Sequence, residues 1–358
     1  MRDSLFNFNH ICNMKILLYF SLAFVLAKSG CTASNVDSNS TSKQEKTETS
    51  NSKVESVQIA FYNVENLFDT INEAGKNDGE YTPEGKKNWN SKKYKEKLEH
   101  LNQVIASIDS SGELLAIGVA EIENLRVLQD LINYSFMKER GFQIVHQESP
   151  DFRGIDVAFM YNANKMKITG SEWININLPE KGKTTREILR VDAELKSENI
   201  TFYINHWPSR WGGQEKSNPK RIAAARALRK NIDKKWSDNP NEHIIIMGDL
   251  NDYPNNESVM TVLKADSTTS GALYNTTWQL HKEDNIGSHN YKGKWGMLDQ
   301  IIVSNSFMPF VDSVYVFKKN WMCYQNKKGK WLPSRTHSGP KYYGGYSDHL
   351  PVIIKVEK

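Results

Sequence analysis

Short apolar runs recur along the C-terminal part of the chain, and polar side chains follow many of them. Residues 244–247 are Ile-Ile-Ile-Met and are followed by Gly248, Asp249, Leu250 and Asn251. An uninterrupted, mostly β-branched run predicts a strand covered on both faces, after which Gly248 is expected to let the backbone turn. Alone, the Asp-Asn pair also fits a simple turn. The same reasoning predicts strands over 57–62, 114–120, 142–146, 155–161, 200–205, 243–248, 298–303 and 351–356.

Apolar residues at helical spacing predict helices between these strands. One spans residues 92–108, and another follows Asn124, whose side chain suits a helix N-cap. A further helix is expected to begin at Asn218-Pro219, since proline suits the first helical turn, and to end near Trp236. Because helices lie between strands early and late while 142–205 has an antiparallel pattern, we expect an α/β fold with mixed sheets and helices outside.

The N-terminus has the pattern of an export signal. Residues 16–27 are apolar and follow Met14, the expected start; they are too few to cross a bilayer but suit a secretory signal. Two processing routes fit this pattern. Residues 25–27 suit ordinary cleavage, whereas Ser29-Gly30-Cys31 resembles the end of a bacterial lipobox, in which Cys31 carries the lipid. We predict the lipoprotein, although Lys28 is unusual for that motif.

Residues 32–56 separate this signal region, 1–31, from the rest of the chain. They are almost all Ser, Thr, Asn, Lys, Glu or Asp, cannot bury enough apolar surface to fold, and are predicted to form a flexible tether. Residues 57–358 are then expected to form one domain. We therefore expect a monomer outside the cytoplasm, either anchored to a membrane through Cys31 or secreted.

Cysteine content and net charge argue against a cysteine nucleophile and against a dedicated nucleic-acid coat protein. The 358-residue chain has three cysteines; Cys12 and Cys31 lie in the signal region, and no Cys-His signature marks Cys323 as a nucleophile. The net charge of +4 falls to +2 when residues 1–30 are removed with their three cations and one anion. This charge is too small for a dedicated nucleic-acid coat.

The polar residues at the predicted strand ends form the candidate site. They are Asn63, Glu121, His206, Asp249, Asn251, Asp299, Asp348 and His349. Their carboxylates and amides are hard oxygen ligands that suit Mg²⁺, without the cysteine or multi-histidine sets that zinc prefers. Histidines and an Asp-Asn pair beside a cation can orient a nucleophile and stabilise the charge of phosphoryl transfer. The sequence has neither a matching phosphate-binding loop nor a Gly-x-Ser-x-Gly elbow.

The segment from about 318 to 346 combines cations with aromatic side chains. The cations are Lys318, Lys319, Lys327, Lys328, Lys330, Arg335 and Lys341, and the aromatic residues are Trp321, Tyr324, Trp331, Tyr342, Tyr343 and Tyr346. Cations and stacking faces suit single-stranded nucleic acid. A surface loop with a few packed aromatic side chains has the same composition, so both interpretations remain open at this point.

Six motifs occur in a fixed order over residues 57–356. They are Tyr62–Asp69, Ala120-Glu121, Asn205–Arg210, Gly248–Asn251, Leu298–Ile301 and Ser347–His349. Together they resemble the endonuclease/exonuclease/phosphatase superfamily of deoxyribonuclease I-like enzymes, and within it the bacterial secreted or lipoprotein branch. The resemblance implies a four-layered α/β sandwich, in which two mixed, mostly antiparallel sheets pack face to face with helices outside. It implies no single substrate, because the superfamily spans deoxyribonucleases, abasic-site nucleases, sphingomyelinases and inositol-phosphate phosphatases.

The resemblance also implies which residues bind metal and substrate. Glu121 would be the principal ligand of Mg²⁺, with Asn63 nearby and Asp348 able to join the metal shell; Mn²⁺ and Ca²⁺ are the alternative ions. Arg153 and Arg210 are candidate substrate contacts.

The catalytic roles follow from the same resemblance. Asp249 would orient or deprotonate the attacking water, and Asn251 would hold the scissile phosphate. His206 would contact the phosphate or the leaving oxygen. Asp299 would fix the tautomer of His349 and keep this histidine cationic toward the phosphate.

These observations predict a metal-dependent phosphodiester hydrolase, with an extracytoplasmic nuclease that cleaves DNA or RNA as the leading interpretation. The alternative is a phosphodiesterase or phosphatase acting on phospholipid, sugar or inositol phosphates, which the small net charge and the membrane tether favour. A non-catalytic binding module would be expected to have lost catalytic groups, yet all of them are present.

Overall fold

The computed structural model of the chain describes residues 6–7, 56–268, 271–283 and 286–357. The expected signal region and tether lie outside the described residues, apart from Phe6, Asn7 and Ser56. None of the described helices is long and apolar enough to cross a membrane.

Two seven-stranded sheets form the centre of the molecule. The first has the order β1 (Phe6–Asn7), β15 (Val311–Val316), β20 (Val352–Glu357), β2 (Ser56–Leu67), β3 (Leu114–Ile122), β5 (Asp156–Asn162) and β4 (Phe142–His146). The second has the order β10 (Ala265–Asp266), β11 (Leu273–Asn275), β14 (Asp299–Ser304), β9 (His243–Asp249), β8 (Glu198–His206), β7 (Ile188–Leu195) and β6 (Lys167–Ile174). Among these neighbours β2–β3, β8–β9 and β10–β11 are parallel and the others antiparallel, so the predicted mixed, mostly antiparallel sheets are confirmed.

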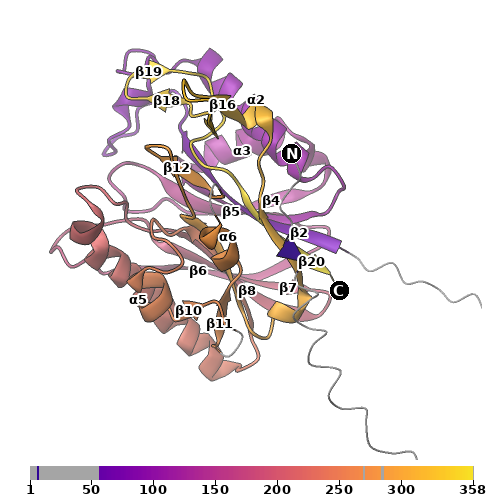
Figure 1. Cartoon of the computed structure of the whole chain (residues 1–358). Coiled ribbons are helices and arrows are strands. Elements are labelled where there is room, and N and C mark those ends of the chain that lie inside the picture. Colours follow the sequence, from indigo (N-terminus) through magenta and orange to yellow (C-terminus); the bar gives the residue numbers. More distant parts are fainter. Residues whose placement is uncertain (1–5, 8–55, 269–270, 284–285, 358) are drawn as a thin grey trace, which may run out of the picture.

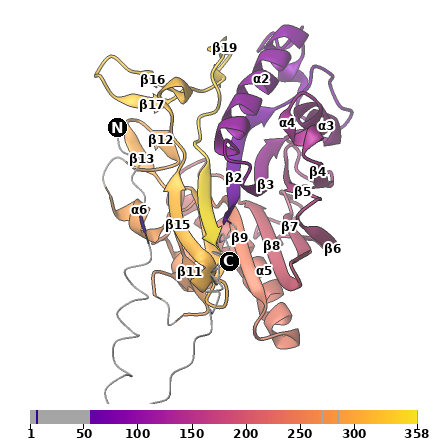
Figure 2. The same ribbon diagram turned by 90° about the vertical axis from the view of Figure 1, so that its right-hand side faces the viewer.

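Apolar side chains pack in separate layers between these sheets and the helices. Phe61, Phe159 and Met247 belong to the layer between the two sheets. The outer face of the first sheet is covered by α2 (Ser91–Ile108), α3 (Leu125–Asn133) and α4 (Phe136–Glu139), and that of the second by α5 (Gln214–Asp238). Figures 1 and 2 show these helices outside the two sheets, which confirms the four-layered sandwich.

The helices begin close to their predicted positions, with one exception. Asn124 caps α3 as expected, because its side chain accepts a hydrogen bond from the N–H of Val127. The predicted start of α5 at Asn218-Pro219 is wrong, because the helix begins at Gln214 and contains Pro219. The turn before the proline is closed by Ser217, whose N–H and hydroxyl both donate to the carbonyl of Gly213.

Several strands were not predicted because they are exposed or short. Alternate residues of β6 are exposed, so it lacks the apolar run that marks the central strands. The region after α6 (Trp278–Lys282) contains three small hairpins: β12–β13 (His289–Tyr291 and Lys294–Gly296), β16–β17 (Cys323–Gln325 and Trp331–Pro333) and β18–β19 (His337–Ser338 and Lys341–Tyr342). Segment 318–346 is therefore built largely from two of these hairpins rather than from one loop.

Candidate active site

Three of the candidate residues lie in one row across the second sheet. His206 ends β8 and is paired with Asp249, which ends the parallel strand β9; Asp299 begins β14 and is paired with Asp249 from the other side. Strand order and register alone therefore bring two carboxylates and an imidazole together. Gly248 does not turn the chain as expected. It lies within β9, where an added Cβ atom would come within 2.4 Å of the carbonyl oxygen of Asn205.

A bulge in the first sheet sets the position of Glu121. Asn63 in β2 is paired with Ala120 in β3, and the register shifts directly after these two residues. Glu121 has a φ of +64°, and Glu65 and Asn66 in β2 have φ values of +52° and +49°. Such left-handed conformations are strained for residues with a Cβ atom and are concentrated at functional sites. The N–H of Asn66 donates to Glu121 Oε2 at 2.9 Å and fixes the carboxylate.

Side chains from the two sheets meet at Asp249. Asn63 Nδ2 lies 3.1 Å from Asp249 Oδ2 and 3.4 Å from Glu121 Oε1, and donates to both oxygens. His206 Nε2 lies 3.8 Å from the same oxygen of Asp249 and 4.0 Å from the same oxygen of Glu121. The structure therefore brings Asn63 and Glu121, two of the residues predicted to bind metal, together with Asp249, which is predicted to activate water.

His349 is held against Asp299 by the loop that precedes β20. Its Nδ1 lies 2.6 Å from Asp299 Oδ2, and its Nε2 lies 3.8 Å from Asp249 Oδ2. The hydroxyl of Ser347 fixes this loop, because it donates to the carbonyl of Asn63 and accepts from the N–H of His349. With Nδ1–H donated to Asp299, Nε2 is the nitrogen directed toward Asp249.

Neighbouring carboxylates determine the charge of His349. Burial disfavours the charged ring, but Asp299, Asp249 and Asp348 outweigh burial and raise the pKa of His349 well above its usual value. The ring is therefore cationic at neutral pH.

His206 and Asp249 are shifted in different ways. Burial is the main cause that lowers the pKa of His206 well below its usual value, and the nearby cations Arg186 and Arg153 lower it further. Burial and the charge of Asp299 raise the pKa of Asp249 to about 7. The site thus combines a cationic imidazole, a neutral imidazole and a carboxylate that exchanges its proton near neutral pH, which is a suitable set for acid-base chemistry.

Asn251 follows β9 in a left-handed conformation, with a φ of +50°. Its N–H donates to Asp249 Oδ1 at 2.9 Å, and its Nδ2 donates to the carbonyl of Trp207 at 3.0 Å. Arg210 supports this turn, since its Nε donates to the carbonyl of Asn251 at 2.7 Å and its guanidinium lies 3.3 Å from the carboxylate of Asp252. The structure ties Arg210 to protein groups, and its contact with substrate stays a prediction.

Arg153 and Asp348 each contact another polar side chain. The guanidinium of Arg153 donates to Asn66 Oδ1 at 3.0 Å, beside the backbone N–H that holds Glu121. Asp348 Oδ2 lies 3.4 Å from the guanidinium of Arg335. Asp348 groups with two histidines, so its place in one metal shell with Glu121 stays a prediction.

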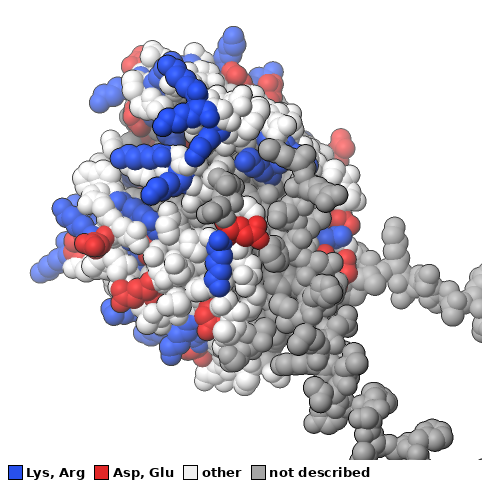
Figure 3. Space-filling view, in the orientation of Figure 1, with Lys and Arg blue, Asp and Glu red and all other residues white. Residues whose placement is uncertain are grey.

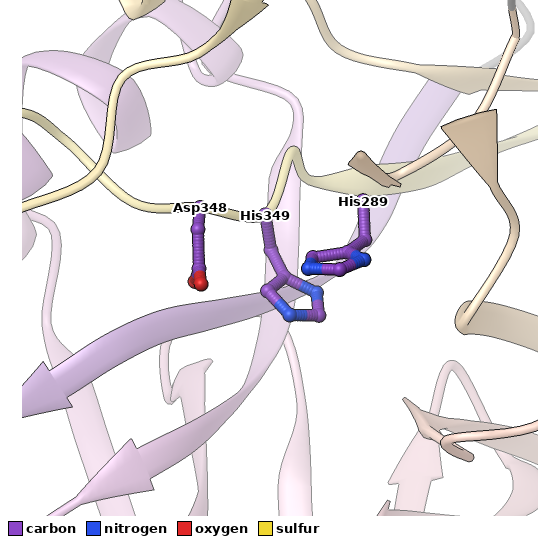
Figure 4. Close-up of side chains that lie close together, drawn as sticks. All are labelled: His289, Asp348 and His349. Atoms are coloured by element: carbon purple, nitrogen blue, oxygen red, sulfur yellow. The ribbon is translucent and has the colours of Figure 1, made fainter. Parts of the chain in front are cut away.

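His289 also lies at the site, although the sequence did not predict it as a site residue. This residue lies in β12, forms a β-bridge with His349, and places its ring centroid 4.7 Å from that of His349 at an interplanar angle of 36° (Figure 4). No motif surrounds His289, and its position depends on a contact between segments far apart in the sequence.

A buried lysine and a buried glutamate near the site were also not predicted. Lys97 in α2 donates from Nζ to Thr336 Oγ1 at 2.7 Å and to the carbonyl of Tyr346 at 2.6 Å. Glu65 accepts from the N–H of Thr336 at 2.6 Å. Burial lowers the pKa of Lys97 to about 8 and raises that of Glu65 to about 7, while the attraction between the two groups opposes both shifts. The pair ties the segment before Asp348 to β2 and α2.

The aromatic side chains of segment 318–346 divide into packed and exposed groups. Trp321 packs against Tyr346 at a centroid distance of 5.0 Å, and Tyr342 packs against Trp89. The exposed group consists of Tyr324, Trp331 and Tyr343. Packing of the first group is as expected for a surface loop with packed aromatic side chains, and nucleic-acid binding by the exposed group stays a prediction.

The donor set around Glu121 fits a hard dication. Carboxylate oxygens of Glu121 and Asp249 both accept from the side-chain amide of Asn63. Burial and the charge of Asp299 raise the pKa of Asp249, which means that its ionised form is disfavoured. A bound cation would stabilise that ionised form. Asn63 Oδ1 accepts from the N–H of Glu65 at 3.0 Å, so Asn63 would bind a metal through the second lone pair of that oxygen.

Comparisons with known proteins agree with this geometry. The sequence profile of the Endonuclease/Exonuclease/phosphatase family matches residues 58–358. The sequence matches no curated protein.

Solved structures show the same fold at low sequence identity. A mannosyl-6-phosphatase of Bacteroides thetaiotaomicron is 16% identical, with a TM-score of 0.56 over 84% of this chain and 99% of that one. TDP2 of D. rerio, complexed with a single-strand DNA product, is 14% identical, with a TM-score of 0.52 over 85% and 99% of the two chains. The human nocturnin catalytic domain is 16% identical, with a TM-score of 0.53 over 85% and 95%.

The family match covers the described domain from residue 58 onward, and the observed fold agrees with it. The chain belongs to the Endonuclease/Exonuclease/phosphatase family, whose members are phosphoester hydrolases.

Proposed function

We propose that this protein is an extracytoplasmic, Mg²⁺-dependent nuclease that cleaves DNA or RNA phosphodiesters. The observation that carries the proposal is the meeting of Glu121, Asp249 and the Asp299–His349 pair at one edge of the two sheets. These groups suit hydrolysis of a phosphoester. That reaction needs a bound metal ion, a base that takes a proton from water, and a positively charged group facing the phosphate.

Glu121 would hold the Mg²⁺ ion, with Asn63 and Asp348 as further oxygen ligands. The bound ion would neutralise charge on the phosphate and the leaving oxygen. Oε2 of Glu121 accepts the N–H of Asn66 at 2.9 Å, whereas Oε1 accepts only a longer bond of 3.4 Å from Asn63, so Oε1 would be the oxygen that binds the ion.

Asp249 is placed to act as the base. With a pKa of about 7, a large fraction of the carboxylate is ionised at neutral pH and can still take a proton from water. The N–H of Asn251 holds Oδ1, which directs Oδ2 toward the centre of the site.

The two histidines and Asn251 would contact the phosphate. His349 presents a cationic Nε2–H because Asp299 stabilises its charge, whereas His206 donates as a neutral ring. Asn251 gives one amide hydrogen to Trp207 and retains the other for a phosphate oxygen.

A nucleic-acid substrate is supported by the surface beside the site. Figure 3 shows Lys and Arg side chains gathered over the part of the molecule where Figure 1 places β12, β16, β18 and β19. Exposed aromatic rings accompany these cations, as in Lys341 over Tyr343 at 4.8 Å and Lys292 over Tyr291 at 5.2 Å. Such pairs can contact phosphates and stack on bases of a single strand.

The test is incubation of the purified protein with plasmid DNA, single-stranded DNA and RNA, in Mg²⁺ and in EDTA. We expect Mg²⁺-dependent cleavage, which Glu121→Gln should abolish. A parallel panel of sugar phosphates, inositol phosphates and phospholipid headgroups covers the alternative activity. Turnover of that panel without cleavage of any nucleic acid would overturn the nuclease assignment.

We infer an extracytoplasmic location from the signal-like residues 16–27 and the polar segment 32–56. Cell fractionation with Cys31→Ala tests this inference: the variant should lose lipid labelling and membrane association. Recovery of the unaltered protein in the cytoplasm would contradict it.

A further inference from the structure

His289, Asp348 and His349 form a second group of metal-ligating side chains beside the Glu121 position. Each offers one nitrogen or oxygen atom, and these atoms lie within 4.8 Å of one another. Asp348 and His349 extend from the same loop, whereas His289 reaches them from β12 (Figure 4). The backbone holds the two segments together, because the N–H of Leu350 donates to the carbonyl of Ser288 at 2.7 Å.

The donor set of this group differs from that around Glu121. Two imidazoles and one carboxylate suit Zn²⁺ and related transition metals, whereas Mg²⁺ prefers oxygen ligands and keeps its waters. Tetrahedral zinc ligands about 2.1 Å from the ion lie about 3.4 Å apart, so small side-chain rotations would bring these atoms into place.

The surroundings of the two histidines support metal binding. His349 Nδ1 lies 2.6 Å from Asp299 Oδ2, which leaves Nε2 for an ion; a carboxylate behind the ring is the usual partner of a metal-bound histidine. The His289 ring packs against the ring of His349, and neither of its nitrogens is hydrogen-bonded within the part of the chain that the structure describes. No hydrogen-bond partner of His289 there has to be displaced, and the ion would compete only with the guanidinium of Arg335, 3.4 Å from Asp348 Oδ2.

We propose that His289, Asp348 and His349 bind a transition-metal dication such as Zn²⁺, and that this ion inhibits the enzyme. On binding, the metal replaces the proton on Nε2 of His349 and the proton leaves to solvent. With the metal on Nε2, which faces Asp249 at 3.8 Å, His349 can no longer donate from that nitrogen to the phosphate. The inhibition rests on the function proposed above, whereas the binding does not.

The binding test uses the purified full chain freed of metal with EDTA. It is titrated with Co²⁺, whose visible absorption reports ligand type, and with Zn²⁺ by calorimetry. His289→Phe keeps a ring against His349 but removes both nitrogens. We expect this variant to bind either ion at least about tenfold more weakly, which is about 1.4 kcal/mol.

Two matched variants make the result specific. His100→Phe replaces another stacked histidine, 4.4 Å from the ring of Tyr346, and should bind like the parent. His146→Phe removes a ligand from the separate group of His146, Glu148 and Asp156. Unchanged Zn²⁺ affinity in His289→Phe, or loss of binding only in His146→Phe, would overturn the proposal.

Inhibition is measured at saturating Mg²⁺, with each variant compared with its own rate without Zn²⁺. The parent should lose activity at Zn²⁺ concentrations at least about tenfold lower than His289→Phe does. Equal sensitivity would overturn the inhibitory role. If no phosphoester were turned over, the function proposed above would fail, and the Co²⁺ titration would still decide the binding.

Discussion

Replacing Asp299 by Asn tests whether this carboxylate keeps His349 charged. Asn has the same shape and still offers an oxygen to Nδ1–H of His349, but it carries no charge. Asp299 is fully buried and lies 2.6 Å from that nitrogen. Burial lowers the pKa of His349, and the charge of Asp299 is the largest effect that raises it. The substitution should therefore lower the pKa of the ring without removing the hydrogen bond.

The size of the effect follows from the strength of a charge-assisted hydrogen bond. Such a bond contributes about 1.5–3 kcal/mol, and one pKa unit corresponds to about 1.4 kcal/mol, so the pKa of His349 should fall by about one to two units. If the cationic ring stabilises the transition state, the rate above that pKa should fall by about tenfold for each unit, or about 10- to 100-fold in all. The loss should be smaller at acidic pH, where the variant ring regains its proton.

The assay is the pH dependence of kcat for a phosphoester turned over by the parent, at saturating Mg²⁺. The alkaline limb of the profile should move to lower pH in Asp299→Asn. Asp109→Asn is the matched control, because Asp109 is a buried carboxylate bonded to Arg140 at the far end of β3 and should leave the profile unchanged. A uniform rate loss at every pH, with no movement of the alkaline limb, would refute the assigned role of Asp299.

Two further predictions concern stability. Lys97→Met should lower the free energy of unfolding by about 3–5 kcal/mol in urea denaturation at neutral pH, because it removes the buried hydrogen bonds of Lys97 and the cation whose charge stabilises Glu65. Glu65→Gln in the same chain should restore part of the loss, and a change below about 1 kcal/mol would contradict the attraction between the two groups. Burial lowers the pKa of His337 to about 3. Between about pH 6.5 and pH 3 this histidine is therefore protonated in the unfolded chain but not in the folded one, so the free energy of unfolding should fall as the pH drops through that range. His337→Gln should reduce that slope by up to about 1.4 kcal/mol per pH unit, and an unchanged slope would show that other groups cause it.

The residues at the strand ends could be predicted because a local pattern marks them. Central strands such as β9 are continuous apolar runs, so the polar residue that ends each run is visible in the sequence. The pairing of Asp249 with both His206 and Asp299 depends on strand order, which spacing in the sequence does not give.

Other features depend on contacts that the sequence does not mark. His289 becomes part of the site through a bridge to His349, and Lys97 through hydrogen bonds to Thr336 and Tyr346. The exposed strand β6 lacks an apolar run, and Pro219 suggested a later start for α5 than Ser217 permits. In each case tertiary or capping contacts outweigh the local pattern.

In the proposed mechanism, Asp249 activates water beside a metal held by Glu121. Asp249→Asn keeps an acceptor for the N–H of Asn251, so the fold should persist, but the side chain can no longer take a proton. We predict that kcat for the preferred phosphoester falls by about 10²–10⁴ while Mg²⁺ affinity, measured by calorimetry, changes by less than about tenfold. Turnover by Asp249→Asn at close to the parent rate would contradict this mechanism.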